Sequence, residues 1–162
     1  MSYYILSTRL IKYFKCMRII NVSSAAHRNI KLNESDYQNN YNYNGWFAYK
    51  RSKLANIYLT YEMHRKYADT GHIINCLHPG VVNTNFANNN NIFYKTAACI
   101  IKYFGISPKE GAKTAVYLAT HKDIKDISGL YFDKCYPKKT SKVSYDLTAA
   151  DKLWNYSESL LS

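Results

Sequence analysis

The strongest constraint on the fold is an alternation of short strand-like runs with longer helical segments. Residues 18–22 form a β-branched run bounded by polar residues, and a second strand-like run at 72–77 ends at a His-Pro-Gly turn. A long helical segment at 46–67 separates these runs, and a helix at 107–120 precedes a third short run at 130–133. Strands that alternate with helices favour a parallel sheet with right-handed crossovers. We therefore expect an α/β fold with about three parallel strands side by side and flanking helices.

Capping residues predict where several helices begin or end. Ser107 is an N-cap, the proline after it suits the first helical position, and Glu110 completes a capping box. Gly71 ends the long helix. Thr148 and Asp151 mark the start of a terminal helix that runs through residue 160. The remaining expected segments are a helix at 3–15 with Ser2 as its N-cap, a polar loop at 29–44, an asparagine-rich loop at 85–91 and a short helix at 92–104.

Tyr49 and Lys53 carry the clearest candidate chemistry. Their i, i+4 spacing places a phenol and an ammonium on the same face of the long helix, one turn apart. A free Tyr titrates near pH 10 and is a poor base at neutral pH, but a nearby Lys favours the phenolate. A stabilisation of roughly 3–4 kcal/mol would let Tyr49 exchange a proton with an alcohol or carbonyl near pH 7. Ser24, at the end of a neighbouring strand, could hold the substrate oxygen. The alternative is a packed Tyr beside a solvated Lys.

The order and spacing of three sequence blocks strengthen the catalytic interpretation. Tyr49 lies 49 − 24 = 25 residues after Ser24, and a third block at 75–84, which contains the His-Pro-Gly turn, follows the helix. In this order the blocks resemble the short-chain dehydrogenase/reductase family, most of all its retinol dehydrogenase-like branch, which includes the WW-domain-containing oxidoreductases. The resemblance covers nearly the whole chain. It is carried by residues 18–27 (RIINVSSAAH), 48–56 (AYKRSKLAN), 77–82 (LHPGVV), 111–112 (GA), 128–132 (SGLYF) and 152–154 (KLW).

The resemblance implies an NAD(P)-dependent oxidoreductase that interconverts an alcohol and a ketone or aldehyde, with a retinoid-, steroid- or lipid-like substrate. In the family pattern Tyr49 is the catalytic acid/base and Ser24 orients the substrate carbonyl. Lys53 favours the phenolate and hydrogen-bonds the nicotinamide ribose, so Tyr49 and Lys53 both also contact the cofactor. Ser23 is left as structural. The other implied cofactor-binding positions are Pro79, Gly80, Val82 and Thr84, and NAD and NADP stay open as alternatives.

One element of the family is missing from the sequence. A dinucleotide-binding domain of this kind opens with a strand and a glycine-rich turn at a helix N-terminus. The chain has six glycines, and none of them belongs to such a turn. We therefore interpret residues 1–162 as a single domain, the C-terminal, active-site part of a Rossmann fold (a doubly wound parallel sheet) without its N-terminal strands and nucleotide-binding half. The strand at 18–22 would then have an unpaired edge.

Composition bounds the remaining alternatives. A net charge of +11 suits a nucleic acid, an anionic membrane surface or a phosphate-bearing cofactor. The lysines and arginines are scattered and no basic helix accompanies them, so we do not expect nucleic-acid binding. The sequence contains no uninterrupted apolar window of about 18 residues, so we expect no transmembrane segment. The five histidines and four widely spaced cysteines show no metal-ligand spacing, so no metal site is expected, and reduced thiols favour a cytoplasmic location.

Three functions from different classes follow from these features. The first is the oxidoreductase, acting on a small-molecule alcohol or carbonyl. The second is a non-catalytic fragment or pseudoenzyme that serves as an interaction module, and the third is a basic nucleic-acid-binding protein. NAD(P)H binding would favour the first, and salt-sensitive retention of nucleic acid would favour the third. We also expect a homodimer through the helix that bears Tyr49, because this helix is apolar on more than one side and forms the dimer face in the family.

Overall fold

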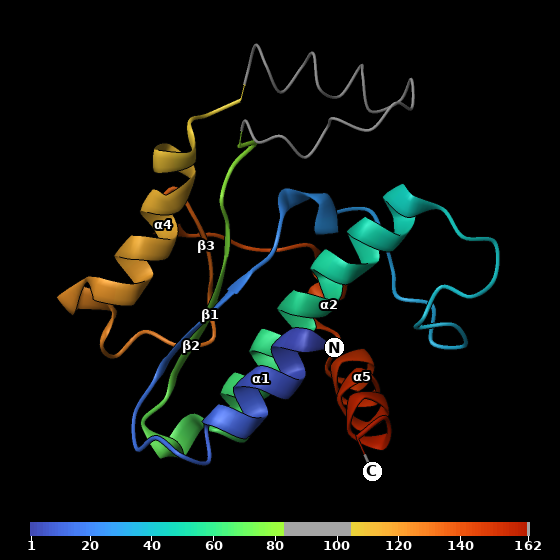
Figure 1. Cartoon of the computed structure of the whole chain (residues 1–162), viewed down its shortest axis with the longest axis horizontal. Coiled ribbons are helices and arrows are strands. Elements are labelled where there is room, and N and C mark those ends of the chain that lie inside the picture. Colours follow the sequence, from blue (N-terminus) through green and yellow to red (C-terminus); the bar gives the residue numbers. More distant parts are fainter. Residues whose placement is uncertain (83–104, 162) are drawn as a thin grey trace.

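The computed structural model describes residues 1–82 and 105–161 (Figure 1). The predicted loop at 85–91, the predicted helix at 92–104 and Thr84 lie outside the described residues. In chain order the elements are α1 (Ser2–Leu10), β1 (Arg18–Val22), η1 (Ala25–His27), α2 (Gly45–Lys66), η2 (Ala68–Thr70), β2 (Ile73–His78), α4 (Pro108–Thr120), η4 (Lys122–Ile124), β3 (Tyr131–Asp133), β4 (Tyr136–Pro137), η5 (Lys142–Tyr145) and α5 (Leu147–Ser159).

The strands form one sheet in the order β1-β2-β3-β4. β1, β2 and β3 are parallel, with Asn21 opposite Cys76 and Cys76 opposite Tyr131. This arrangement confirms the predicted α/β fold of three parallel strands with flanking helices. β4 is an addition that the sequence did not predict, and it pairs antiparallel with β3 through a turn in which Lys134 and Cys135 both adopt left-handed backbone angles. Within the described sheet β1 is the edge strand, as expected for the run at 18–22.

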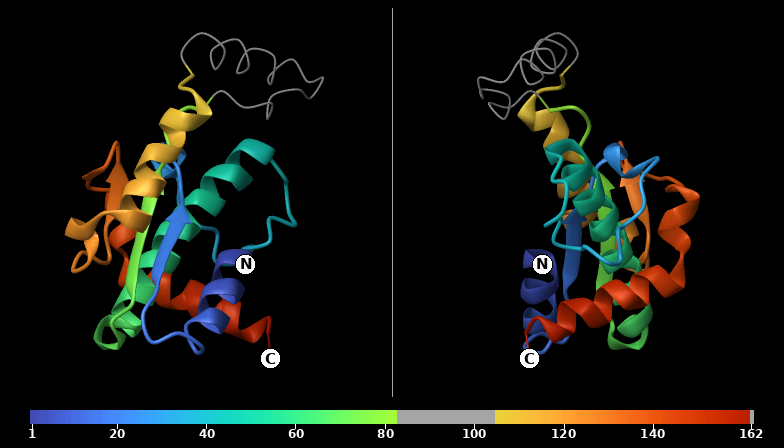
Figure 2. Two further views of the ribbon diagram at one scale, coloured as in Figure 1. Left: turned by 60° about the vertical axis from the view of Figure 1, so that its left-hand side comes forward. Right: turned by 90° about the vertical axis from the view of Figure 1, so that its right-hand side faces the viewer.

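Helices cover both faces of the sheet (Figure 2). Successive strand residues point to opposite faces, so Ile19 and Ile74 pack on the side of α1, α2 and α5, where Met63 of α2 joins them. On the other side, Leu77 packs with Leu118 of α4. α5 lies along α2 and is the outer layer on that side. The strand ends are therefore held between α4 and α2. None of the described helices combines the length and apolarity needed to cross a membrane.

The starts of two helices differ from the prediction. α5 begins after Asp146, whose side chain accepts a hydrogen bond from the Ala149 N–H at 3.0 Å, so the predicted cap Thr148 lies inside the helix. Asp and Thr are both good N-caps, and the sequence does not rank two of them placed so close together. α1 begins at Ser2 without a side-chain cap and ends at Leu10 instead of residue 15, because the chain turns there toward β1.

The ends of α4 and α2 follow the prediction in part. Ser107 Oγ accepts a hydrogen bond from the Glu110 N–H at 3.2 Å, as predicted. The Glu110 carboxylate does not complete the capping box, since it pairs with Lys113 at 2.6 Å. Gly71 has the predicted left-handed backbone, with φ of +76°, but α2 already ends at Lys66 and Gly71 ends the short η2 that follows.

The chain on either side of residues 83–104 is joined at the carboxyl end of β2. Val82 forms a parallel bridge with Ile106, and the Ile106 N–H donates to the Val81 carbonyl at 2.8 Å. We call this pairing of Val82 with Ile106 the clasp. Gly80 has φ of +89°, and a Cβ there would lie 2.6 Å from the Ile106 side chain. Glycine therefore suits both the backbone angle and the close approach of the clasp.

Candidate active site

Ser24 lies at the edge of the sheet where the carboxyl ends of the three parallel strands meet. Open α/β sheets bind their ligands at this edge. Ser24 follows β1 and caps η1, with its Oγ accepting a hydrogen bond from the Ala26 N–H at 3.2 Å. His78 ends β2, and its Nδ1 accepts a hydrogen bond from the Ala25 N–H at 3.3 Å. The predicted residue Ser24 is thus brought next to the predicted turn at 79–82.

Tyr49 and Lys53 lie on one face of α2, as their spacing predicted. Lys53 Nζ is 5.5 Å from the centroid of the Tyr49 ring, and it donates a hydrogen bond to the Val22 carbonyl at 3.4 Å. The Lys53 side chain is half-buried, and this burial lowers the pKa of its ammonium. The ammonium and the phenol therefore form a pair beside the last residue of β1.

Further hydrogen bonds fix β1 to the part of α2 that carries this pair. Ser23 Oγ donates to the Lys53 carbonyl at 2.7 Å, and Asn56 Nδ2 donates to the Val22 carbonyl at 3.0 Å. Ser23 is buried, so its hydroxyl serves this contact and faces away from solvent. The Val22 carbonyl receives donors from both Lys53 and Asn56. The end of β1 is consequently held in a defined position relative to the α2 face that bears the phenol.

An indole ring that the sequence analysis did not single out covers Tyr49. The rings of Trp46 and Tyr49 are stacked, with centroids 5.8 Å apart and an interplanar angle of 17°. Their i, i+3 spacing on a helix is the signal that could have predicted this contact. Among the described residues no hydrogen bond joins the Tyr49 hydroxyl to Ser24. The two side chains therefore come from adjacent elements without bonding each other directly.

The turn at 79–82 is held in place by α4 and the clasp. Pro79, Gly80 and Val82, the implied cofactor contacts, follow directly after β2. A Cβ added to Gly111 of α4 would lie 2.5 Å from the Val82 side chain, so the helix approaches this turn closely because residue 111 is glycine. The fourth implied contact in this turn, Thr84, lies outside the described residues. The turn is consequently a fixed wall of the candidate site.

His27, which the sequence indicated as a structural residue, is a buried part of the same edge. Its Nδ1 lies 2.6 Å from the Ser24 carbonyl oxygen, and its Nε2 accepts a hydrogen bond from the Ser141 N–H at 3.2 Å. Ser141 is 114 residues away along the chain, so local sequence patterns carry no signal for this contact. His27 therefore connects the loop of Ser24 to the segment that leads into η5.

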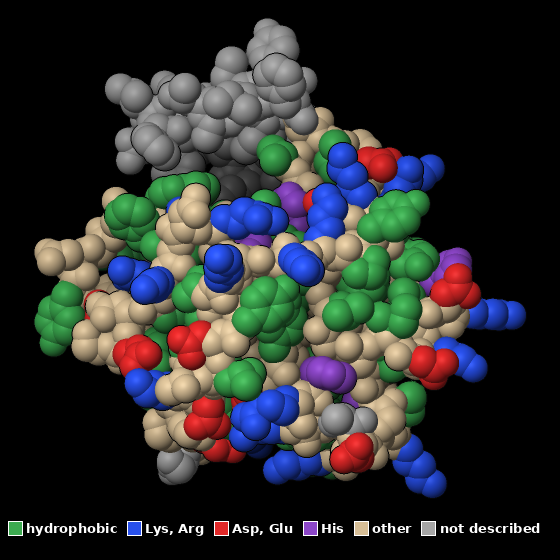
Figure 3. All heavy atoms as spheres, turned by 180° about the vertical axis from the view of Figure 1, so that it is seen from behind, with side chains coloured by type: hydrophobic (Ala, Val, Ile, Leu, Met, Phe, Trp, Pro, Cys, Tyr) green, Lys and Arg blue, Asp and Glu red, His purple; other side chains and the backbone are tan. Residues whose placement is uncertain are grey.

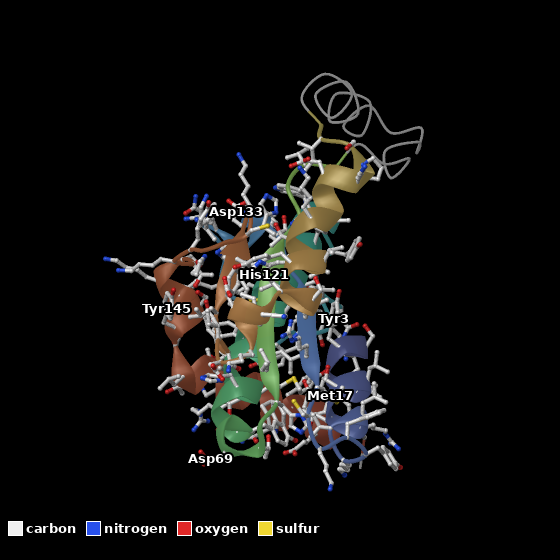
Figure 4. All side chains as sticks on the ribbon, turned by 90° about the vertical axis from the view of Figure 1, so that its left-hand side faces the viewer. Tyr3, Met17, Asp69, His121, Asp133 and Tyr145 are labelled. Carbon is white, nitrogen blue, oxygen red and sulfur yellow. The ribbon has the colours of Figure 1, made fainter. Side chains whose placement is uncertain are left out.

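Charged side chains flank this edge of the sheet. Asp133 ends β3 and pairs with Lys138 at 2.8 Å, and Figure 4 shows Asp133 at the same end of the molecule as the first turn of α4. Burial lowers the pKa of His78, an effect that Asp133 opposes and that Lys138 and Arg28 reinforce. On the face drawn in Figure 3, lysines and arginines are dispersed with acidic side chains among them. Over residues 1–82 and 105–161, no three His, Cys, Asp or Glu side chains are grouped to hold a metal ion.

Comparison with known proteins decides the family. No family model matches the chain. Retinol dehydrogenase 14 of Homo sapiens is 36% identical over 152 residues, which are 92% of this chain and 45% of that protein. Short-chain dehydrogenase TIC 32 A, chloroplastic, of Brassica napus is 34% identical over 149 residues, 89% of this chain and 47% of that protein. The chain belongs to the short-chain dehydrogenase/reductase family.

A solved structure shares the fold of this chain. The crystal structure of an uncharacterized protein from Mycobacterium Paratuberculosis superimposes with a TM-score of 0.64 at 28% identity, over 88% of this chain and 49% of that one. The chain spans about half the length of the curated relatives it matches. The predicted family, including its retinol dehydrogenase-like branch, is therefore confirmed. The division into a C-terminal part and a missing nucleotide-binding half stays a prediction, as does the cytoplasmic location.

Proposed function

We propose that this chain carries the active-site part of an NAD(P)-dependent oxidoreductase that interconverts an alcohol and a ketone or aldehyde. The observation that carries the proposal is the pair formed by Lys53 and Tyr49, with the ammonium 5.5 Å from the phenol ring. This pair sits beside the end of β1, next to Ser24, where an open α/β sheet binds its ligand. The names of the relatives, which include retinol dehydrogenases and a short-chain dehydrogenase, support the same class of reaction.

In this proposal each of the three side chains has a separate task. Tyr49 takes the hydroxyl proton of the alcohol onto its phenolate oxygen during oxidation and returns it to the carbonyl oxygen during reduction. Lys53 places a positive charge beside the phenol, with its ammonium 5.5 Å from the ring centroid. Ser24 holds the substrate oxygen by donating its hydroxyl proton, because among the described residues its Oγ makes one hydrogen bond, in which it accepts from the Ala26 N–H.

The edge of the sheet fits the nicotinamide end of NAD or NADP. The turn at 79–82 follows a parallel strand, and Gly80 in this turn has a left-handed backbone and no side chain of its own. Pro79, Gly80, Val82 and Lys53 are the residues that would hold this end, with Thr84 as a further contact. When bound, the nicotinamide accepts or supplies the hydride of the reaction. For the pyrophosphate we assign no residue of this chain.

We propose an apolar alcohol, of retinoid, steroid or other lipid-like type, as the substrate class. The half-exposed indole of Trp46 stacks on Tyr49 and offers an apolar surface directly beside the phenol. Phe47, at the start of the same helix, is a second exposed aromatic residue. Flat or extended apolar ligands gain affinity from aromatic surfaces of this kind. The retinol named in the human relative's title is consistent with the same class.

The first test is cofactor binding to the purified full chain. Titration of NADH and NADPH, followed by fluorescence and by calorimetry, is expected to show saturable binding of at least one of them. Tyr49→Phe is expected to abolish turnover of a lipid-like alcohol while leaving the fold intact, because it removes only the hydroxyl. Tyr13→Phe is the matched control, since Tyr13 is exposed and remote from α2 in the sequence. Absence of binding, or undiminished turnover in Tyr49→Phe, would refute the catalytic proposal for this chain.

A second candidate function rests on the edge strand. β1 is outermost in the described sheet, and the chain spans about half the length of its relatives. An edge strand presents unpaired backbone groups to another chain, so we propose strand pairing with a protein partner as the alternative, non-catalytic role. A dimer through α2 is less well supported, because α2 already packs on the sheet and on α5. Loss of self-association or partner capture on substituting a β1 residue with proline would distinguish strand pairing from catalysis.

A further inference from the structure

The peptide unit between Ser24 and Ala25 is held at both of its polar groups by imidazole rings. His27 Nδ1 lies 2.6 Å from the Ser24 carbonyl oxygen, and His78 Nδ1 lies 3.3 Å from the Ala25 nitrogen. The first ring comes from η1 and the second from the end of β2, so the two contacts approach the peptide from different elements. A peptide with both groups bonded to buried or half-buried side chains has little freedom to rotate.

The hydrogen bonds define the protonation state of both rings. The Ser141 N–H can only donate, so His27 Nε2 must carry a lone pair, and the proton of the neutral ring resides on Nδ1 and is donated to the Ser24 carbonyl. By the same reasoning His78 Nδ1 accepts from the Ala25 N–H and is unprotonated. We propose that His27 and His78 are positioning residues, which as neutral imidazoles fix the Ser24–Ala25 peptide and thereby aim the Ser24 hydroxyl at the substrate oxygen.

The surroundings of His27 favour the neutral form that this role requires. The ring is fully buried and makes an edge-to-face contact with Tyr131, with centroids 5.4 Å apart. Burial lowers the pKa of His27, and the hydrogen bond to Ser24 opposes this effect in part. The charge of Arg28 lowers the pKa further, as does that of His78 once His78 is protonated. A proton added to Nε2 would point at the Ser141 N–H and break that contact. Acid is therefore expected to break the contact between His27 and Ser141, while the Nδ1–H bond to the Ser24 carbonyl remains.

The groups around His78 give it the same dependence on pH. Burial lowers its pKa most, the Asp133 carboxylate raises it, and Lys138 and Arg28 lower it. Protonation of His78 Nδ1 would place a donor against the Ala25 N–H. Both rings therefore contribute stability that is present above the ordinary histidine pKa of 6.5 and is lost as the pH falls through their lower folded-state values.

Nuclear magnetic resonance of the full chain labelled with ¹⁵N-histidine tests the assignment without any enzyme activity. We expect His27 to be the Nδ1–H tautomer, to titrate below pH 6.5, and to move the Ala25 and Ser141 amide signals as it titrates. An Nε2–H tautomer, or Ala25 and Ser141 amides that ignore the titration, would overturn the assignment. His121→Phe is the control, because His121 is exposed and its removal is expected to leave both amides unchanged.

Variants test whether the contacts of His27 and His78 with the Ser24–Ala25 peptide serve catalysis, a step that rests on the proposed function. His27→Phe keeps the ring volume and removes both hydrogen bonds, and it is expected to lower kcat roughly 10²-fold with KM little changed, since the misplaced Ser24 no longer meets the substrate oxygen. His27→Asn retains a donor near the Nδ1 position and is expected to recover part of the loss. Wild-type kcat in a folded His27→Phe would overturn the positioning role. If the wild-type chain shows no turnover, the proposed function fails. The tautomer and amide measurements alone then decide whether His27 and His78 fix the Ser24–Ala25 peptide.

Discussion

Asn75 is the position at which a single substitution tests the packing of the sheet most directly. It lies in β2, is 1% exposed, and bonds the backbone of the turn before β3 with both ends of its amide. Nδ2 donates to the Ile127 carbonyl at 2.7 Å, and Oδ1 accepts from the Leu130 N–H at 2.9 Å. The side chain thus fixes the turn before β3 to β2 through two hydrogen bonds.

The expected cost of Asn75→Ala follows from these two bonds. Each buried polar group left without a partner costs about 1–3 kcal/mol, and water reaching the vacated space lowers that figure, so we expect about 2–4 kcal/mol. Whole domains are stable by about 5–15 kcal/mol, and the variant therefore loses a large part of the total. With a urea dependence of about 2 kcal/mol per molar, the unfolding midpoint is expected to fall by about 1–2 M.

Urea unfolding followed by circular dichroism measures this change. Asn75→Asp keeps the acceptor for Leu130 but loses the donor and sets a carboxylate against the Ile127 carbonyl, so at pH 7 it is expected to cost at least as much as alanine. Asn155→Ala is the control, because Asn155 makes its hydrogen bond to Asp151 on the surface of α5 and is expected to stay within about 0.5 kcal/mol of wild type. A loss below about 1 kcal/mol in Asn75→Ala would show that the amide does not support the turn.

Two backbone substitutions give further predictions. Gly129→Ala is expected to lower the melting temperature by several degrees, because φ is +77° and the new Cβ would clash with the His64 ring. Gly45→Ala is its control, with only ordinary contacts around the added carbon, and equal effects of the two would contradict the steric explanation. Lys134→Gly is expected to stabilise the chain by about 0.5–1 kcal/mol in urea, since Lys134 has φ of +52°. Lys139→Gly is the control, because Lys139 lies outside the left-handed region, and it is expected to be neutral or destabilising. A destabilised Lys134→Gly would contradict the explanation that the left-handed backbone of Lys134 is strained.

The parts of the fold with strong local signals were predictable from the sequence. The run Arg18–Val22 is the observed β1, and α2 differs from its predicted bounds by one residue at each end. Both elements form because they bury apolar side chains, and the spacing of those side chains in the sequence indicates which face is buried. The α5 cap was misassigned because Asp146 and Thr148 satisfy the same rule, and only the observed bond distinguishes them.

The parts that depend on distant contacts were not predictable. β4 follows a tight turn that lacks the Asn-Gly or Gly-rich sequence such turns favour. Its left-handed residues are supported from α4, where Thr114 Oγ1 accepts a hydrogen bond from the Cys135 N–H at 3.2 Å. In the candidate site, the pairing of Tyr49 with Lys53 follows from helical geometry, whereas the bond from Ser141 to the ring beside Ser24 needs the folded chain.

The clasp has a consequence for how this protein can vary. Because Val82 and Ile106 are paired, the chain leaves the scaffold and rejoins it at one point. The entropic cost of joining two fixed ends rises only slowly with the length of chain between them, so the clasp lets that length change with little effect on β2 or α4. The candidate site residues and the residues between the two ends of the clasp can therefore diversify separately, each under its own selection.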